Sequence, residues 1–535
     1  MTDETGDTTR GERQSATIID LDKARKEAER RRRRSQDQLD QLVEKLNQRF
    51  CVVPEGNEVF VFREQRDPLR KGHWQLNKFT FKAFRELLMN RRVVVDVSDP
   101  RHPGFTKQIV KTHAEIWLEH RDRRECPGGP IFDPTGNASN YYWNLWRGFA
   151  VKPVKNRQGW LLMQDHIYHV LAAGDRKVND YILNWSAHML QHPERHGEVA
   201  LIFRDDAEGL GKGLFVKALL AILGTHGFHL HHADQLRGQF NAYMHRLVLL
   251  YLDEAGWAGD RQLEGYLKGL VSDEEIGVQY KNKDTFQALN YLHIIISSNR
   301  DWAINASRTS RRWAPFRVSD HRRGDRAYFT ALSHEIEHGG AEAMLYDLLR
   351  RDLSCFDVRD YPRTAELDNQ RLLSLDILPR WWMAVLLRGF VYKPKWGAPS
   401  LLDWHEFHTT QLLVESHRQF CKAIPHYHPA TEVEIGKFMK ETIGYRWTSR
   451  RAAEPIAELD TIDRFEASRR DERQPEFPIG TTDDERPASS PTDWREAAII
   501  RKRRMNGYDC GSLEEARATF KAALGDLPME WDAPG

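Results

Sequence analysis

A glycine-rich loop with a lysine follows directly after an unbroken apolar run, and this arrangement constrains the fold more than any other part of the chain. The apolar run, Val199–Phe203, has the length and continuous hydrophobicity of a strand that is buried on both faces. Apolar residues at helical spacing follow from Leu214 onward. The loop between them contains Gly209, Gly211, Lys212 and Gly213. The order strand, glycine loop, helix predicts an α/β domain with a phosphate-binding loop.

The chemistry of phosphate binding explains why these residue types belong together. Glycines let backbone N–H groups approach a phosphate, a helix N-terminus favours negative charge, and a lysine can contact the terminal phosphates. The loop departs from the usual pattern, because Asp206 stands at the first glycine position and Gly213 at the Ser/Thr position that would bind magnesium. A structural glycine turn is the alternative. The residues expected to contact the phosphates are Gly209, Leu210, Gly211, Lys212, Gly213 and Leu214.

A second apolar run ends in two adjacent acids. Leu247–Leu252 has strand length, and Asp253 and Glu254 follow it. A strand that ends in two carboxylates suits Mg²⁺ binding by Asp253 and activation of a water molecule by Glu254. The alternative is an ordinary strand with a solvated acidic end.

A third apolar run, Leu292–Ser298, is followed by Asn299. An amide at that position could orient the attacking water, although Asn is also a common turn residue. Between the second and third runs, residues 278–290 predict a hairpin with a polar tip that carries Lys281 and Lys283. These lysines suit contacts with phosphates that do not read a base sequence, whereas the alternative is a surface hairpin.

Taken together, these segments resemble the superfamily-III helicases, which are AAA+-type motors of viruses and mobile elements. VLLYLDEA resembles their Walker B motif, IGVQYKNKDTFQALNYLHIIISSN resembles the hairpin motif that runs into sensor-1, and SRRWAPF resembles the arginine-finger segment. Three flanking pieces, IFDPTG, WNLWRGFAVKP and GQFN, are similar to phage and prophage primase-helicase proteins related to the poxvirus-type NTPases. The resemblance covers roughly residues 40–450.

The resemblance implies a function and an assembly. It implies an ATP-dependent DNA helicase that replicates a phage or mobile element, with ATP and Mg²⁺ as cofactors and a homo-hexamer or similar ring on single-stranded DNA. Arg312, with Arg311 as second choice, would contact the nucleotide of the neighbouring subunit, and Asn299 would sense the γ-phosphate. No cluster of acids that could serve a complete primase precedes the motor, so a separate primase or polymerase is a possible partner.

The expected fold is an α/β P-loop (AAA+-like) motor core with an N-terminal α+β region and a helical, winged-helix-type C-terminal module. Helical spacing predicts helices over Lys107–Arg121, Trp404–Ala423 and Trp494–Met505. Five histidines on or just after two predicted helices, His166 among them, are interpreted as ordinary surface and core residues rather than as a metal site. The expected divisions are 1–20 disordered, 21–150 N-terminal α+β region, 151–197 helical lead-in or collar, 198–320 ATPase core, 321–395 helical lid, 396–460 winged-helix-type DNA-binding module, 461–492 linker and 493–535 helical appendage.

Composition narrows the class of protein. With 40% hydrophobic and 29% charged residues, the chain of 535 residues is typical of a globular protein. A net charge of +1 means that nucleic acid must be bound by local basic clusters, such as Lys437, Lys440, Arg446, Arg450 and Arg451 in the C-terminal module. Five scattered cysteines indicate a reducing compartment, and no apolar run approaches the length of a membrane span. The expected location is the cytoplasm of a bacterial host.

Three other functions compete with the helicase. A nucleotide-binding replication loader or defence switch would explain Gly213, because a lost metal ligand can leave binding without turnover. In an origin-binding initiator, the C-terminal module would dominate and unwinding would be secondary. A small-molecule P-loop kinase would explain neither the hairpin lysines nor the arginines.

Overall fold

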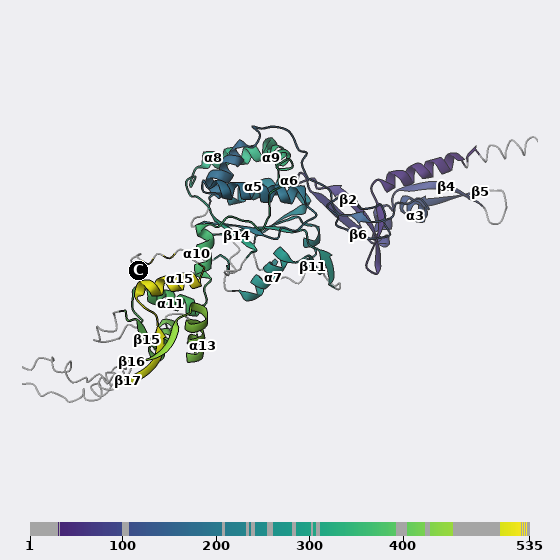
Figure 1. Ribbon diagram of the computed structural model, residues 1–535. Coiled ribbons are helices and arrows are strands. Elements are labelled where there is room, and N and C mark those ends of the chain that lie inside the picture. Colours follow the sequence, from purple (N-terminus) through teal and green to yellow (C-terminus); the bar gives the residue numbers. More distant parts are fainter. Residues whose placement is uncertain are drawn as a thin grey trace, which may run out of the picture. The chain divides into compact units, whose positions relative to one another are not determined.

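In the computed structural model, the chain divides into two compact units (Figure 1). The first comprises Met1–Arg300 with Arg312–Pro362, and the second comprises Asp301–Arg311 with Arg363–Gly535. The structure describes residues 30–31, 33–98, 106–205, 209–231, 235–236, 241–253, 260–280, 285–300, 303–306, 311–391, 404–422, 428–452, 503–525, 527, 529 and 531.

A five-stranded sheet forms the centre of the first unit. All of its strand pairs are parallel, and the strand order is β14-β8-β13-β10-β9. The strands are β8 (Ala200–Arg204), β9 (Gly227–Leu230), β10 (Leu249–Leu252), β13 (His293–Ser298) and β14 (Trp313–Arg317). Strands β8, β10 and β13 are buried along their whole length, which is why each appears in the sequence as a continuous apolar run rather than an alternating one.

Helices cover both faces of this sheet, with α5, α6, α8 and α9 on one side and α7 on the other (Figure 1). Trp185, Phe203 and Phe215 are fully buried in the shared core. The hairpin β11 (Glu275–Val278) and β12 (Phe286–Leu289) pairs antiparallel outside the sheet. The helical elements are α4 (Leu161–His166), the π-helical turn η1 (Ile167–Leu171), α5 (Arg176–Gln191), α6 (Lys212–Leu223), the 3₁₀ turns η2 (Gly224–His226) and η4 (Met244–Arg246), α7 (Arg261–Ser272), α8 (Arg326–Glu335), η5 (Ile336–Gly340) and α9 (Ala341–Leu348).

The N-terminal region of the first unit has its own small core. Phe50, Phe84 and Trp117 pack there with ring centroids 5.0–6.2 Å apart. Its elements are a helix over 33–47, β1 (Cys51–Glu55), β2 (Glu58–Arg66), β3 (Trp74–Phe79), α2 (Phe81–Leu87), β4 (Arg92–Ser98), β5 (Thr106–Thr112), α3 (His113–Glu119), β6 (Pro130–Ile131) and β7 (Trp143–Asn144).

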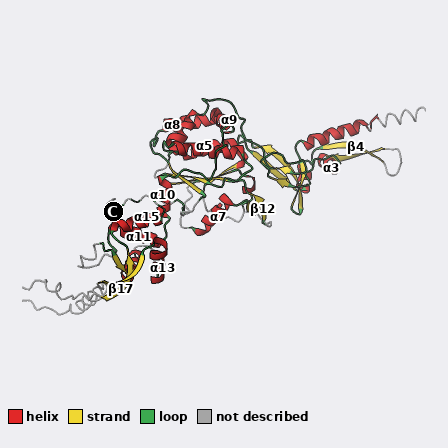
Figure 2. Cartoon of the chain, in the orientation of Figure 1, coloured by secondary structure: helices red, strands yellow, loops and turns green. Residues whose placement is uncertain are grey.

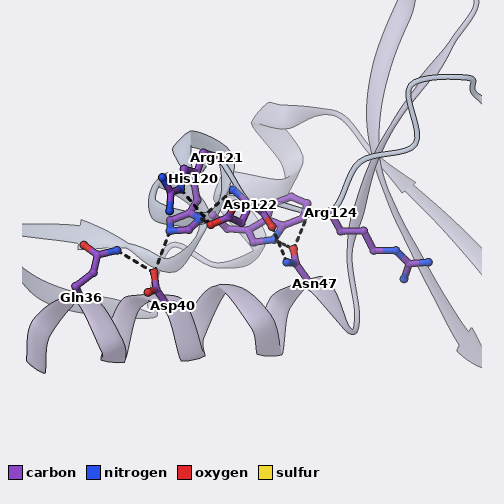
Figure 3. A network of polar contacts seen from close by, with 8 residues as sticks. Gln36, Asp40, Asn47, His120, Arg121, Asp122 and Arg124 are labelled. Carbon is purple, nitrogen blue, oxygen red and sulfur yellow. Dashed lines mark hydrogen bonds and ion pairs between the residues drawn. The ribbon is translucent and has the colours of Figure 1, made fainter. Parts of the chain in front are cut away.

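A polar network fixes the helix over 33–47 to the segment that follows α3 (Figure 3). Asp40 accepts a hydrogen bond from Gln36 at 2.8 Å, and its Oδ1 lies 3.3 Å from His120 Nε2. Asn47 Oδ1 accepts a hydrogen bond from the Arg124 backbone N–H at 2.7 Å. The contacts of Asp40 with His120 and of Asn47 with Arg124 join parts of the chain that are about 80 residues apart, so they hold the region together as one body.

The second unit combines helices with a three-stranded antiparallel sheet of order β15-β17-β16 (Figure 2). Two tryptophans, Trp381 and Trp382, fill its core, and the Trp382 indole donates to the Tyr445 hydroxyl at 3.2 Å. The elements are α10 (Ala365–Leu373), α11 (Ile377–Arg388), β15 (Phe407–Thr409), α12 (Thr410–Cys421), α13 (Glu432–Lys437), η7 (Phe438–Ile443), β16 (Arg446–Ala452), β17 (Arg503–Asp509) and α15 (Leu513–Ala523).

The structure confirms the α/β class, the three strand predictions around the glycine loop and the hairpin. Three helix predictions are wrong in part. The helix predicted over Trp404–Ala423 is confirmed for Thr410–Cys421 (α12), and residues 494–502 of the helix predicted over Trp494–Met505 lie outside the described residues. Within Lys107–Arg121 the first half is strand β5, because it pairs with β4 along its length. Residues 407–409 form β15, and residues 503–509 form β17, which pairs with both β15 and β16.

The unit boundaries also differ from the expected divisions. Helices α10 and α11 belong to the second unit, whereas the sequence analysis placed 321–395 in one lid. Strand β17 and helix α15 share a core with α11 and α12 rather than forming a separate appendage. The predictions for 1–20 and 461–492 lie outside the described residues. None of the helices in the described part of the chain has both the length and the apolar character needed to cross a membrane.

Candidate active site

The candidate residues gather where β8, β13 and β10 end. These strands are neighbours and run parallel, so their carboxyl ends lie at one edge of the sheet. The glycine loop follows β8, Asn299 follows β13 directly, and Asp253 follows β10 directly. In open α/β sheets, ligands bind outside the carboxyl ends of the strands. We call this edge, with these three segments, the carboxyl edge.

The glycine loop has the backbone that only glycine adopts easily. Gly209 and Gly211 have φ values of +82° and +85°. Helix α6 starts at Lys212, and no side chain caps its first turn. The Leu214 N–H donates to the Gly211 carbonyl at 2.9 Å, whereas the N–H groups before it have no preceding helical turn to accept from them and favour an anion. Leu210 is buried beneath the loop and fixes it to the core.

Lys212 is held by a carboxylate that the sequence analysis did not select. Its Nζ donates to Asp205 Oδ1 at 2.6 Å, and the Asp205 side chain is completely buried. Asp205 directly follows β8, and its backbone N–H donates to Ser298 on the adjacent β13 at 3.1 Å. The ammonium group is thus kept at the carboxyl edge, next to the glycine loop and the start of helix α6.

His166 is a second residue that sequence reasoning missed. This buried side chain on α4 places Nε2 3.1 Å from the Gly211 carbonyl oxygen. Burial lowers the pKa of His166 to about 4, so the ring is neutral at pH 7 and can donate its Nε2 proton to that carbonyl. A Cβ on Gly211 would lie 2.7 Å from both His166 and Phe329. The close packing fixes the conformation of the loop.

A hydroxyl network orients Asp253. Its Oδ1 accepts hydrogen bonds from the Tyr251 hydroxyl at 2.9 Å and from the Ser297 hydroxyl. The two hydroxyl oxygens also lie 2.9 Å apart. His229 Nε2 lies 3.5 Å from the other carboxylate oxygen, and burial lowers the pKa of His229. Burial also raises the pKa of Tyr251, so its hydroxyl stays protonated and remains a donor to Asp253.

The residues present fit a magnesium ion that is shared with nucleotide phosphates. Mg²⁺ in such sites is held by one or two carboxylates together with phosphates and waters. Asp253 supplies one oriented carboxylate, and Gly213 leaves open space, since no atom lies within 4 Å of a Cβ built there. Among the described residues, no group of three or more His, Cys, Asp or Glu side chains could hold a metal alone.

The arginines lie at the other end of the sheet. Arg312 directly precedes β14, and its carbonyl accepts from Ala200 at the start of β8 at 2.9 Å. The side chain of Arg312 is partly buried, and its Nε has no hydrogen-bond partner within the described part of the chain. Arg311 is exposed. The structure therefore does not bring the arginines to the carboxyl edge.

Asn299 is exposed at the carboxyl edge, as the sequence predicted. Four residues of the predicted site or its loop lie outside the described residues: Asp206, Glu254, Lys281 and Lys283.

Comparison with known proteins adds three findings. The family described as "Family of unknown function (DUF5906)" matches residues 205–312, less than half of the chain. That match begins at Asp205 and ends at Arg312, so it includes every catalytic and nucleotide-binding residue that the sequence predicted, although not His166. The "DNA Primase-polymerase" of Nitratiruptor phage NrS-1 is 31% identical over 143 residues, which are 26% of this chain and 20% of that protein.

The fold resembles solved structures of the same phage protein. The apo structure of the NrS-1 C-terminal region aligns with a TM-score of 0.55 at 17% identity and covers 77% of this chain and 96% of that chain. A second apo form aligns with a TM-score of 0.52 at 16% identity over the same shares. The chain is therefore related in sequence to a small part of a phage primase-polymerase and shares the fold of that protein's C-terminal region.

Proposed function

We propose that this chain is an ATP-hydrolysing motor that acts on single-stranded DNA during replication of a phage or mobile element. The observation that carries this proposal is the convergence of Lys212, Asp253 and Asn299 at one edge of a parallel sheet. The relationship to a phage primase-polymerase supports the replication setting. The resemblance to superfamily-III helicases supplies the expectation of unwinding and of a ring.

Each residue of the carboxyl edge has a role in the proposed hydrolysis. The loop N–H groups and Lys212 bind and orient the phosphates of ATP, whose phosphoanhydride bond supplies the energy for movement. Asp253 would hold Mg²⁺ together with those phosphates, and Tyr251 and Ser297 keep its carboxylate oriented. Glu254 accepts a proton from the attacking water, and Asn299 orients that water.

Lys212 must exchange partners when nucleotide binds. Its ammonium group now contacts the buried carboxylate of Asp205. A phosphate at the loop would compete with that carboxylate for the same ammonium protons. Asp205 thus positions the lysine before binding and limits how far it can move.

Arg312 is proposed to act on a neighbouring subunit. Strand β8 has five residues, so at about 3.3 Å per residue its two ends lie roughly 15 Å apart. Arg312 at the start of β14 is therefore too far away to stabilise phosphate at its own carboxyl edge. A head-to-tail interface, which closes into a ring, would bring it to the next subunit's nucleotide.

A second candidate, the origin-binding initiator, rests on the second unit. Its order of helix, strand, two helices and two strands suits a winged-helix-type module. Lys437, Lys440 and Arg446 are exposed on it, and Trp447 is 52% exposed. Arg450 forms an ion pair with Asp509, so we expect it to contribute less to phosphate binding than the other predicted basic residues of this module.

ATP turnover with and without single-stranded DNA tests the proposed function. Lys212→Ala should abolish both binding and turnover, whereas Glu254→Gln should bind ATP but lose turnover by about 10²–10⁴-fold. Lys217→Ala is the matched control, because this lysine lies on the same helix and pairs with Glu337 at 2.6 Å on the surface. ATP binding without turnover in the unaltered protein would instead favour the loader or switch.

A further inference from the structure

A large cavity in the first unit lies apart from the carboxyl-edge residues. It has a volume of about 1120 Å³ and lies among the β1–β2 turn, residues 128–132 and the β11–β12 hairpin. Small-molecule sites usually occupy about 300–1,000 Å³, so this cavity is large enough for a ligand of several rings. The side chains that carry the argument are Glu55, Phe132, His245, Gln279, Tyr280 and Phe286.

Three rings form one wall of this cavity. Tyr280 and Phe286 are stacked, with their centroids 6.0 Å apart and their planes 13° apart. His245 lies 5.9 Å from Tyr280 and 6.5 Å from Phe286. Phe286 is 43% exposed, although it is a large apolar side chain on a strand. An exposed ring that belongs to a stacked group offers a face on which a further flat ring can pack.

The polar groups of the cavity favour a flat neutral ligand over a phosphate. Glu55 and Glu58 line it, and carboxylates repel phosphate. Glu55 accepts from Lys78 Nζ at 2.6 Å, and the same ammonium lies 5.2 Å from the Tyr280 ring. Burial lowers the pKa of His245, so this ring is neutral at pH 7 and adds no positive charge. Carboxylate and amide oxygens can accept hydrogen bonds from the amino groups of bases.

We propose that this cavity binds unpaired bases of single-stranded nucleic acid by stacking them on Phe286 and Tyr280. The inference rests on the proposed function, because it assigns to the motor a second kind of contact with the strand. Phe286 lies on β12, which pairs with β11, and Tyr280 lies two residues after β11, so both rings belong to the β11–β12 segment. The rings would hold the bases, and stacking of this kind tolerates any base.

The first test compares oligonucleotides on the unaltered full-length chain. We would titrate a 2-aminopurine-labelled single strand and a strand of equal length that carries abasic sites, in the absence of nucleotide. The base-bearing strand should bind about tenfold or more tightly than the abasic strand, and 2-aminopurine fluorescence should be quenched by stacking. Equal affinity for the two strands, or no binding of single strands at all, would overturn the inference.

The second test uses a matched pair of phenylalanines. Phe286→Ala should weaken binding of the base-bearing strand by about tenfold and remove the quenching, and Phe286→Trp should restore both. Phe228→Ala is the control, since Phe228 is 38% exposed in the same unit but does not line the cavity. The salt dependence of binding should stay the same in Phe286→Ala, because no phosphate contact is lost.

These measurements separate the inference from the proposed function. Base stacking is measured without ATP, whereas the motor is measured by ATP turnover. If 2-aminopurine fluorescence is quenched but the chain does not hydrolyse ATP, the cavity is supported as a base-binding site and the proposed motor function is contradicted. If the unaltered chain hydrolyses ATP but Phe286→Ala binds the single strand as tightly as the unaltered chain, the motor function is supported and the base-binding site is contradicted.

Discussion

The carboxyl edge and the opposite edge of the central sheet differ in how their charged side chains are satisfied. At the carboxyl edge, Lys212 contacts Asp205, and Asp253 accepts hydrogen bonds from hydroxyl groups of the same chain. At the opposite edge, the Nε of Arg312 is buried and has no hydrogen-bond partner among the described residues. Under the proposed function, this difference corresponds to a nucleotide site formed within one chain and an arginine that acts on a neighbouring subunit.

The largest effect is expected from Arg312→Ala. If the arginine acts on a neighbouring subunit, ATP turnover should fall by about 10³–10⁵-fold, as in NTPases that lose an arginine finger. ATP binding and the unfolding temperature should stay close to those of the unaltered chain, because the guanidinium makes no contact at its own carboxyl edge. Steady-state turnover and nucleotide titration would measure these two effects.

Arg311→Ala is the matched control for that prediction. Arg311 is exposed, and its loss should change turnover far less. If Arg311→Ala lowers ATP turnover more than Arg312→Ala does, the arginine finger is Arg311 instead. An Arg312→Ala chain that no longer binds ATP would contradict the separation of the two edges.

A smaller effect is expected from the packing of the glycine loop. Gly211→Ala forces a side chain into the left-handed region and against His166 and Phe329, so it should lower the free energy of unfolding by about 1–3 kcal/mol. Gly213→Ala is the matched change two residues along, at a helical position with open space. It should leave stability unchanged or raise it by up to about 1 kcal/mol. Chemical denaturation would compare the two variants, and equal stabilities would mean that the loop is not held by close packing.

His166 is expected to change the pH dependence of the free energy of unfolding, with the smallest effect of the three predictions at neutral pH. The pKa of this ring is about 4 in the folded chain, below its ordinary value of 6.5, so the unfolded chain binds the proton more readily. The contribution of His166 to stability is complete above pH 6.5 and is lost as the pH falls from about 6.5 to about 4. The expected loss is on the order of 3 kcal/mol.

His166→Gln isolates that contribution. The amide can still donate to the Gly211 carbonyl but does not titrate, so the variant should lose less stability over this pH range. His226 has a similarly lowered pKa, about 4, and is present in both chains, so its effect cancels in the comparison. Identical pH profiles would show that His166 does not contribute.

The central strands could be predicted because each is buried on both faces. Their apolar runs end where the sheet ends, so Asp253 and Asn299 could be placed at its edge from the sequence alone. The helix over Lys107–Arg121 was overestimated because β5 exists only through its pairing with β4. A local signal was available there, since Thr112 and Glu115 form the capping box that starts α3.

The supporting residues of the site could not be predicted in the same way. His166 contacts a carbonyl 45 positions away, and Ser297 contacts Asp253 from 44 positions away. No local pattern marks such contacts, because they arise only when the sheet and helix α4 are packed. Strand β17 was missed for the same reason, since its partner β15 is about 100 residues earlier in the chain. Asp205 is the exception, because it directly follows a predicted strand and lies seven residues before Lys212.

A subunit-mixing experiment tests most directly whether nucleotide binding and the arginine come from different chains. Lys212→Ala and Arg312→Ala proteins, each without turnover, would be mixed in equal amounts and assayed for ATP hydrolysis. In a head-to-tail assembly about a quarter of the interfaces would combine an intact Lys212 with an intact Arg312, so the mixture should regain about that share of the activity of the unaltered protein. A mixture as inactive as its components, or an unaltered protein that is fully active as a monomer at high dilution, would contradict the account.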